Sequence, residues 1–240
     1  MIKNIKTLLL LVVICASCRT LVVNNERQII SDSQPQLGAI GLLDRNVLNR
    51  TFKTVETPVL KEKIRLELHK EKFDKKGYEA YLKVSPKNTF QISFVDSLAN
   101  KPEFYSLQLS DRVEYVESIK SNEKLVEYLK NKPQLQTVTA VSIAVRSQML
   151  PLFDNAESVF LVYDRKLKKY YLELMEKNGT KEKIYFNDIG VFAFDVSGFC
   201  WGSNHKHEVE LKMLSDGNKC SKDLKRKAAK VNLEKDYLNF

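Results

Sequence analysis

Beyond residue 55, apolar and polar residues alternate along much of the chain with the period of two that is typical of β-strands. The alternating runs end repeatedly at proline or glycine, and many are rich in β-branched or aromatic residues. The run at 137–146 has few polar positions, so we expect a central strand that is buried on both faces. The pattern predicts strands at 63–73, 78–84, 89–95, 103–109, 137–146, 158–164, 169–177, 181–186, 190–196 and 207–214.

The clearest local pattern is a hairpin whose loop contains Gly179. A two-residue loop would place apolar residues opposite charged ones and spoil both faces. A three-residue loop with Gly179 in the left-handed conformation instead pairs Leu172 with Ile184 and Glu173 with Lys183. One face of the hairpin is then apolar and the other is charge-matched, so the pattern favours the longer loop.

Three segments have a helical pattern. Ser121 can cap a helix over 122–132 that ends at Pro133. Ser221 can cap a basic C-terminal helix with a narrow apolar stripe, and residues 147–157 are a third candidate. Because strands outnumber helices and do not alternate with them regularly, we expect an α+β fold, an antiparallel-rich sheet with two or three peripheral helices.

The N-terminus has the pattern of an export signal. Lys3 and Lys6 precede an unbroken apolar run of nine residues, Leu8–Ala16, whereas a membrane-spanning helix needs about 20. A short basic region, a brief apolar run and small residues before a cleavage site describe a secretory signal. The small pair Ala16-Ser17 stands directly before Cys18.

This arrangement resembles the type II signal of bacterial lipoprotein precursors. The resemblance implies cleavage before Cys18 and attachment of lipid to its thiol; the bulky Ile14 excludes Cys15 from this role. It covers only the first 20 or so residues. The alternative is an ordinary secretory signal that is cut near Ala16 or Ser17 and leaves a free cysteine.

The domain organisation follows from these patterns. We expect a signal peptide at 1–17, a lipid anchor with a flexible tether at 18–50, and a single globular α+β domain at 51–240. Arg19 follows the cysteine where an aspartate would retain a lipoprotein in the inner membrane, and no acidic cluster comes next. We therefore expect an outer-membrane protein that faces the periplasm.

Composition narrows the classes of function. The chain has 39 basic and 30 acidic residues, a net charge of +9, and loss of the two signal-peptide lysines leaves +7. With 8 glycines and no glycine-rich phosphate-binding motif, nucleotide binding by backbone amides is not expected. An exported chain without a basic motif interleaved with aromatics is not expected to bind nucleic acid.

Six basic residues within 219–230 form either a solvated helix face or a contact for anionic lipid head groups or other envelope polyanions.

Candidate chemistry is concentrated near the C-terminus. Cys200 and Cys220 are the thiols left after export and acylation, and they are expected to form a disulfide in an oxidising compartment. Three alternatives stay open: a zinc site with His205 and His207, a catalytic Cys–His pair, or two unrelated thiols.

These observations favour a non-enzymatic structural or interaction module of the cell envelope. We expect it to meet the membrane through its anchor, with an envelope protein, anionic lipid or the cell wall as partner, and we expect no cofactor. One alternative is a protein that binds lipid or a small apolar ligand within a curved sheet. Another is an envelope hydrolase, for which the sequence offers no nucleophile beyond Cys200.

Overall fold

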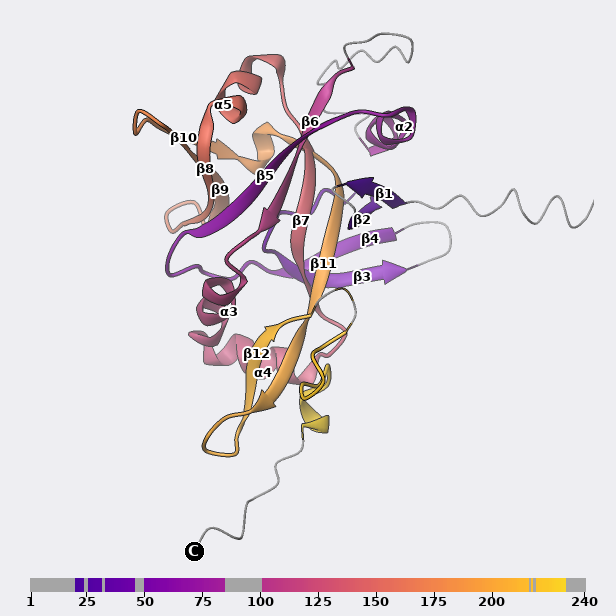
Figure 1. Ribbon diagram of the computed structural model, residues 1–240. Coiled ribbons are helices and arrows are strands. Elements are labelled where there is room, and N and C mark those ends of the chain that lie inside the picture. Colours follow the sequence, from indigo (N-terminus) through magenta and orange to yellow (C-terminus); the bar gives the residue numbers. More distant parts are fainter. Residues whose placement is uncertain are drawn as a thin grey trace, which may run out of the picture.

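The computed structural model describes residues 20–231, apart from 24–25, 32, 46–49, 85–100, 216 and 218. This part of the chain forms a large antiparallel sheet with short helices packed on it (Figure 1). The strands are β1 (Thr20–Val23), β2 (Glu26–Ile30), β3 (Ile40–Arg45), β4 (Arg50–Glu56), β5 (Ile64–Lys72), β6 (Glu103–Leu109), β7 (Gln136–Ala144), β8 (Ala156–Asp164), β9 (Lys169–Glu176), β10 (Lys181–Tyr185), β11 (Gly190–Ser203) and β12 (Val209–Leu214). The helices are α2 (Lys75–Val84), α3 (Arg112–Lys120), α4 (Glu123–Asn131) and α5 (Leu150–Asp154).

The sheet is open, and each strand pairing described is antiparallel. Its order is β1-β2-β11-β7-β6-β5-β8-β9-β10, with β12 added to β11 and the β3–β4 hairpin joined to β7 through β3. The fold is therefore broadly α+β, as predicted, although the sheet dominates it. The described part contains four short helices rather than two or three.

The middle of the sheet is buried on both faces. All nine residues of β7 are buried, as the scarcity of polar positions there predicted. On one face lies the main core, to which α3 and α4 contribute Tyr115, Ile119 and Leu129. The opposite face carries a smaller aromatic core centred on Phe73 and Phe192 and covered by β1 and α2.

Eight of the ten predicted strands are present in the structure. The strand predicted at 78–84 is wrong, because this segment is the helix α2. Tyr78 and Tyr81, three residues apart, contact each other and both meet Phe73, a spacing that brings side chains together on a helix. The strand predicted at 89–95 lies outside the described residues.

The hairpin prediction is confirmed. Lys183 pairs with Glu173 and Ile184 pairs with Leu172, and the connecting loop is the three-residue one. Gly179 has a φ of +83°, in the left-handed region that glycine tolerates.

The cap predicted for the helix at 122–132 is wrong. The helix predicted over 122–132 is α4, but its first turn is capped by the side chain of Asn122, which accepts from the backbone amide of Leu125. Ser121 instead ends the preceding helix, α3, whose N-terminus is capped by Asp111. The candidate at 147–157 contains only a 3₁₀ turn at Ser147–Met149 followed by the short α5.

The described part of residues 18–50 is not a tether. It contributes β1, β2 and β3 to the sheet, and Leu37 and Ile40 are fully buried in the main core. The sequence there shows no sustained alternation of apolar and polar residues, so the pattern did not reveal these strands. The signal peptide and Cys18 lie outside the described residues.

Candidate functional site

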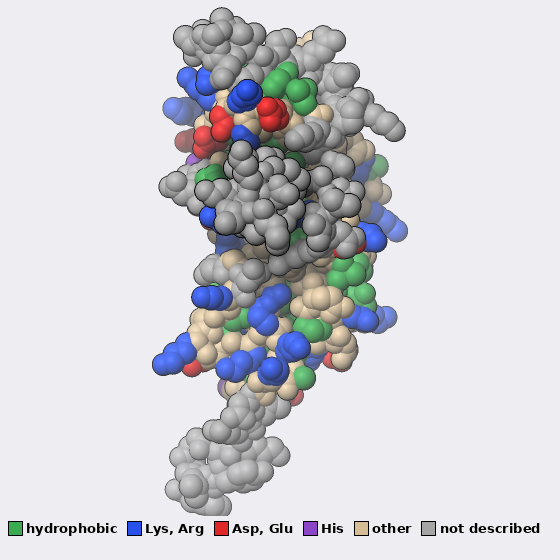
Figure 2. Space-filling view, turned by 90° about the vertical axis from the view of Figure 1, so that its right-hand side faces the viewer, with side chains coloured by type: hydrophobic (Ala, Val, Ile, Leu, Met, Phe, Trp, Pro, Cys, Tyr) green, Lys and Arg blue, Asp and Glu red, His purple; other side chains and the backbone are tan. Residues whose placement is uncertain are grey.

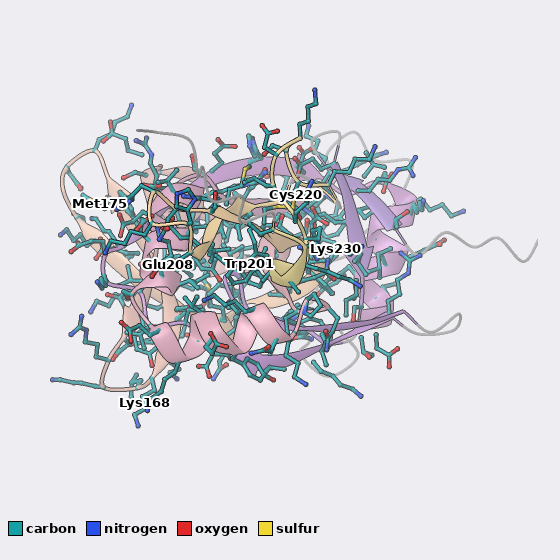
Figure 3. The ribbon with its side chains drawn as sticks, turned by 90° about the horizontal axis from the view of Figure 1, so that it is seen from below. Lys168, Met175, Trp201, Glu208, Cys220 and Lys230 are labelled. Atoms are coloured by element: carbon teal, nitrogen blue, oxygen red, sulfur yellow. A yellow bond between two sulfur atoms is a disulfide. The ribbon has the colours of Figure 1, made fainter. Side chains whose placement is uncertain are left out.

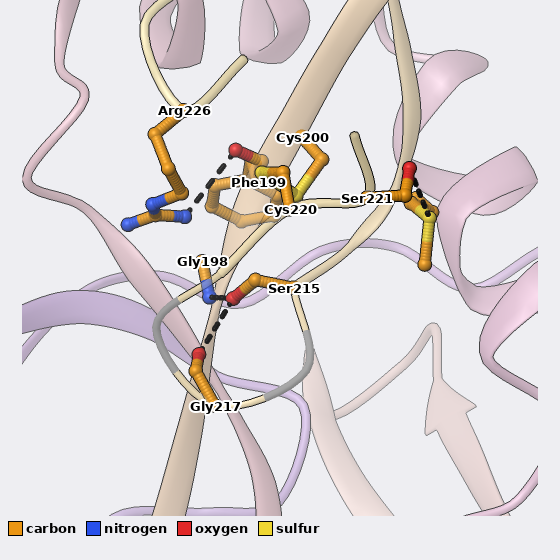
Figure 4. The surroundings of a disulfide bond; sticks show 9 residues. Gly198, Phe199, Cys200, Ser215, Gly217, Cys220, Ser221 and Arg226 are labelled. Carbon is orange, nitrogen blue, oxygen red and sulfur yellow. Dashed lines mark hydrogen bonds between the residues drawn. A yellow bond between two sulfur atoms is a disulfide. The ribbon is translucent and has the colours of Figure 1, made fainter. Parts of the chain in front are cut away.

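The C-terminal segment of residues 219–231, which we call the basic C-terminal segment, is held to the sheet by several contacts. Cys220 forms a disulfide with Cys200 of β11, with a Cα–Cα distance of 5.7 Å, in agreement with the predicted pair (Figure 4). Cys200 is fully buried. The bond therefore fixes the start of the segment to the longest strand of the sheet.

A short turn brings the chain back to β11 after β12 ends at Leu214. The hydroxyl of Ser215 accepts a hydrogen bond from the amide of Gly198 at 2.8 Å and donates to the carbonyl of Gly217 at 2.8 Å. The amide of Ser215 donates to the carbonyl of Gly198 at 2.7 Å. These bonds hold the chain close to β11 just before Cys220.

The C-terminal helix that we predicted after Ser221 is wrong. Lys225 instead forms an isolated antiparallel bridge with Trp201, with backbone N–O distances of 2.8 and 2.9 Å. Only Ala228–Lys230 forms a turn of 3₁₀ helix. The disulfide ties the start of this segment to β11, and the backbone of Trp201 exchanges two hydrogen bonds with Lys225. These tertiary constraints override the local preference for a helix. Figure 3 shows Trp201 near the middle of the molecule with Cys220 and Lys230 close by.

Arg226 makes a further contact between the basic C-terminal segment and β11. Its guanidinium lies directly over Gly198 and donates to the carbonyl of Phe199 at 3.3 Å. Burial lowers the pKa of this guanidinium from its ordinary value.

The zinc and Cys–His hypotheses do not fit this geometry. Both thiols are consumed by the disulfide, and His205 and His207 are exposed in the β11–β12 loop. Asn204 organises that loop by accepting hydrogen bonds from two of its backbone amides, at 2.9 Å each. Within the described ranges no group of three or more His, Cys, Asp or Glu side chains could hold a metal ion.

A cluster of titratable side chains that the sequence did not reveal lies where α5 meets β5 and β6. Lys70 contacts Glu103 at 2.8 Å and Asp154 at 2.9 Å, and Tyr105 donates to Asp154 at 2.7 Å. Burial and the Asp154 carboxylate raise the pKa of the Tyr105 hydroxyl. Each charged group here has an oppositely charged neighbour, so the cluster is typical of a structural ion-pair network that holds α5.

A cavity of about 230 Å³ lies where β2, β4 and β11 meet the turn before the basic C-terminal segment. Two arginines, Arg27 and Arg50, border it. The remaining lining residues are Ile29, Leu43, Asp195, Val196 and Gly217. Its small size and its two guanidinium groups suit a phosphate or carboxylate group rather than a large apolar ligand.

The sheet faces that could have enclosed an apolar ligand are filled with side chains. On the face covered by α2, Phe73 lies 4.8 Å from Phe104 and 5.6 Å from Phe192, measured between ring centroids. On the other face, Tyr105 stacks on Phe153 at 4.8 Å. These contacts are typical of a close-packed core.

The exposed lysines of the basic C-terminal segment are Lys219, Lys222, Lys225, Lys227 and Lys230. Asp223 is the single acidic residue within the segment. Figure 2 shows basic side chains gathered over the lower half of the face on which this segment lies. In the described part of the chain, no helix is both long and apolar enough to cross a membrane.

Comparison of the chain with protein-family models, curated proteins and solved structures gave no match.

Proposed function

We propose that the protein is a lipoprotein of the bacterial cell envelope that is anchored in the outer membrane through Cys18 and acts by binding rather than by catalysis. The proposal places the folded domain in the periplasm. It gives the binding role to the basic C-terminal segment, and an envelope component of negative charge is the partner.

The disulfide between Cys200 and Cys220 is the observation that carries this proposal. Structural disulfides persist in oxidising compartments and are rare in the reducing cytosol. A bridge that fixes 13 C-terminal residues to the sheet therefore supports export. The pattern before Cys18 supports export independently, from the opposite end of the chain.

The basic C-terminal segment supports a binding role. The disulfide, the Trp201–Lys225 bridge and the Arg226 contact hold its backbone in place, while five lysine side chains remain exposed. Holding exposed charges on a fixed backbone lowers the entropy that a partner must remove on binding. The hydrolase hypothesis loses its candidate nucleophile, because Cys200 is oxidised and buried.

Mass spectrometry of the protein extracted from membranes tests the anchor. We expect the mature chain to begin at an acylated Cys18, and Cys18→Ala to move the protein to the soluble fraction. Cys15→Ala is the matched control, because it removes the neighbouring thiol and should leave the protein in the membrane. A soluble wild-type chain that begins at Arg19 or later would contradict the proposal.

A further inference from the structure

The folded domain begins very close to the proposed anchor. Thr20 is the first residue of β1 and pairs with Ile29 of β2, only two residues after Cys18. Two residues span at most about 7 Å. The 30-residue tether expected from the sequence would have let the domain stand off the membrane, but the observed strand does not. An acylated Cys18 therefore holds the β1 side of the domain against the bilayer surface.

Figures 1 and 2 show which elements lie on the same side of the domain as β1. In Figure 1, β1, the end of β3 and the start of β4 lie on the right, the basic C-terminal segment lies below them, to the right of β12, and the β9–β10 hairpin projects to the left. Figure 2 is turned so that the right-hand side faces the viewer, and it shows several basic side chains on the lower half of this face and others near its top. The start of the fold and the basic C-terminal segment thus face the same way.

The arginine cavity joins these two regions. Arg27 belongs to β2, the partner of β1, and Arg50 begins β4. Both border the same cavity as Gly217, in the turn that leads to the basic C-terminal segment. Positive charge therefore continues from the neighbourhood of β1 to the lysines. Asp195 also borders the cavity, and burial, followed by the nearby Glu26 of β2, raises the pKa of its carboxyl group, so acidic as well as basic groups lie there.

Exposed apolar side chains occur on β1, on α2, which packs against β1, and on β3 and β4. Val22 on β1 is 61% exposed, and Leu82 on α2 is 52% exposed. Val55 on β4 and Leu42 on β3 are 43% and 36% exposed. Half of the eight exposed large hydrophobic residues of the described chain lie on these four elements. Basic groups together with exposed apolar side chains are the combination that favours a bilayer interface.

We infer that the face formed by β1, the Arg27–Arg50 cavity and the basic C-terminal segment rests on an anionic phospholipid surface. This inference rests on the proposed anchor at Cys18, and it adds an orientation of the domain and a class of lipid. Guanidinium and ammonium groups bind lipid phosphates, and the cavity has room for one phosphate group over the apolar floor of Ile29, Leu43 and Val196. Each lysine near an anionic leaflet increases membrane partitioning about fivefold.

Lysine labelling on vesicles tests the inference. The acylated protein is extracted from membranes and reconstituted into vesicles of phosphatidylcholine, with or without phosphatidylglycerol. An amine-reactive reagent that does not cross membranes then labels the exposed lysines, and peptide mass spectrometry quantifies each one. We expect labelling of the five lysines of the basic C-terminal segment to fall roughly threefold or more on the anionic vesicles, and high salt to restore it.

Lysines on the opposite side of the domain are the internal reference. Lys166, Lys177 and Lys181 are exposed in the β8–β9 and β9–β10 hairpins, and Figure 3 places the neighbouring Lys168 at the far left edge, away from Lys230. Their labelling should be the same on both kinds of vesicle.

A pair of variants with equal changes in charge sharpens the test. Lys222→Gln/Lys227→Gln/Lys230→Gln should restore the labelling of Lys219 and Lys225 on anionic vesicles. Lys166→Gln/Lys177→Gln/Lys181→Gln should leave their protection intact. Circular dichroism of both variants shows whether each is folded.

The outcomes separate the inference from the anchor proposal. A protein that is acylated and sediments with both vesicles, but whose basic C-terminal segment is labelled equally on both, overturns the inference and leaves the anchor standing. Protection that appears only after a protein extract or cell-wall fragments are added also overturns it, in favour of another partner. A protein without lipid at Cys18 overturns the anchor proposal first, and the orientation with it.

Discussion

The guanidinium of Arg226 occupies the space in which a Cβ atom on residue 198 would lie, so a larger residue there would displace the end of this flexible side chain. Gly198 is buried in β11, and its own amide is bound by Ser215. The contact lies two residues from Cys200. Together with the disulfide, it fixes the basic C-terminal segment against the strand at two points.

Gly198→Ala should destabilise the protein by up to about 1 kcal/mol, because the new methyl group displaces the flexible end of Arg226 and its hydrogen bond to the carbonyl of Phe199. Urea denaturation measures the loss of stability. Limited proteolysis should cut the basic C-terminal segment faster in the variant than in the wild type.

A double-mutant cycle identifies the cause of this effect. Arg226→Ala removes the guanidinium, so adding Gly198→Ala to it should cost much less than Gly198→Ala costs alone. Additive losses from the two substitutions would show that residue 198 tolerates a side chain beside Arg226, contrary to the structure.

Reduction of the Cys200–Cys220 bond should lower the free energy of unfolding by roughly 3 kcal/mol, the loop-entropy value for a closed loop of about 20 residues. Denaturation with and without dithiothreitol measures the change. The sheet should remain folded after mild reduction, while proteolysis removes the basic C-terminal segment.

Cys200→Ala/Cys220→Ala is the matched control for the reductant. Its stability should not respond to dithiothreitol, whereas the wild type should approach it on reduction. A wild type that is insensitive to reductant would mean that the bond contributes nothing to the fold.

The sequence predicted the sheet well because its longer strands carry complete patterns. β7 is buried throughout, so its run of apolar residues was informative. In the hairpin containing Gly179, two strand registers were possible. Only one of them pairs apolar residues with apolar residues on one face and opposite charges on the other, and the structure has this register. In these places local pattern and tertiary structure favour the same answer.

The errors occur where tertiary partners override local pattern. Residues 219–231 have helical spacing, but the disulfide to Cys200 and the backbone of Trp201 hold them in an irregular path. Ser121 and Asn122 are adjacent residues that can both cap a helix, and only the end of α3 decides between them.

The basic C-terminal segment could be predicted only in part. The density of lysines and the cysteine pair were visible in the sequence. The cavity beside them was not, because Arg27, Arg50 and Gly217 are far apart in the chain and meet only once the sheet has formed.

Gly179→Ala should destabilise the β9–β10 hairpin by about 1 kcal/mol, because alanine at a φ of +83° is strained. No atom lies within 4 Å of the position of the new Cβ, so the effect is confined to the backbone. Thermal denaturation measures the loss.

Gly179→Asn is the informative comparison, because asparagine tolerates the left-handed region better than alanine does. If both variants were as stable as the wild type, the loop would not have the conformation described.

The ion pairs of Glu210 should make stability depend on pH. Its carboxylate on β12 lies 2.6 Å from the ammonium of Lys120 on α3 and 2.6 Å from that of Lys212. The hydrogen bond from Lys120, followed by that from Lys212, lowers the pKa of Glu210 below its ordinary 4.5. A carboxyl group whose pKa is lower in the folded state contributes stability above its unfolded pKa and loses it as the pH falls through the folded pKa.

Glu210→Gln should therefore be less stable than the wild type near neutral pH, by up to about 1 kcal/mol for such partly exposed pairs. The difference should shrink as the pH falls below 4.5, where the wild-type carboxylate also becomes protonated. Urea denaturation across this range, at low and high salt, measures it, and high salt should reduce the difference at neutral pH. Glu62→Gln, which removes an exposed carboxylate elsewhere on the surface, is the control for the change in net charge. A Glu210→Gln deficit that stayed constant from neutral to acid pH would show that packing of the side chain, and not its charge, joins β12 to α3.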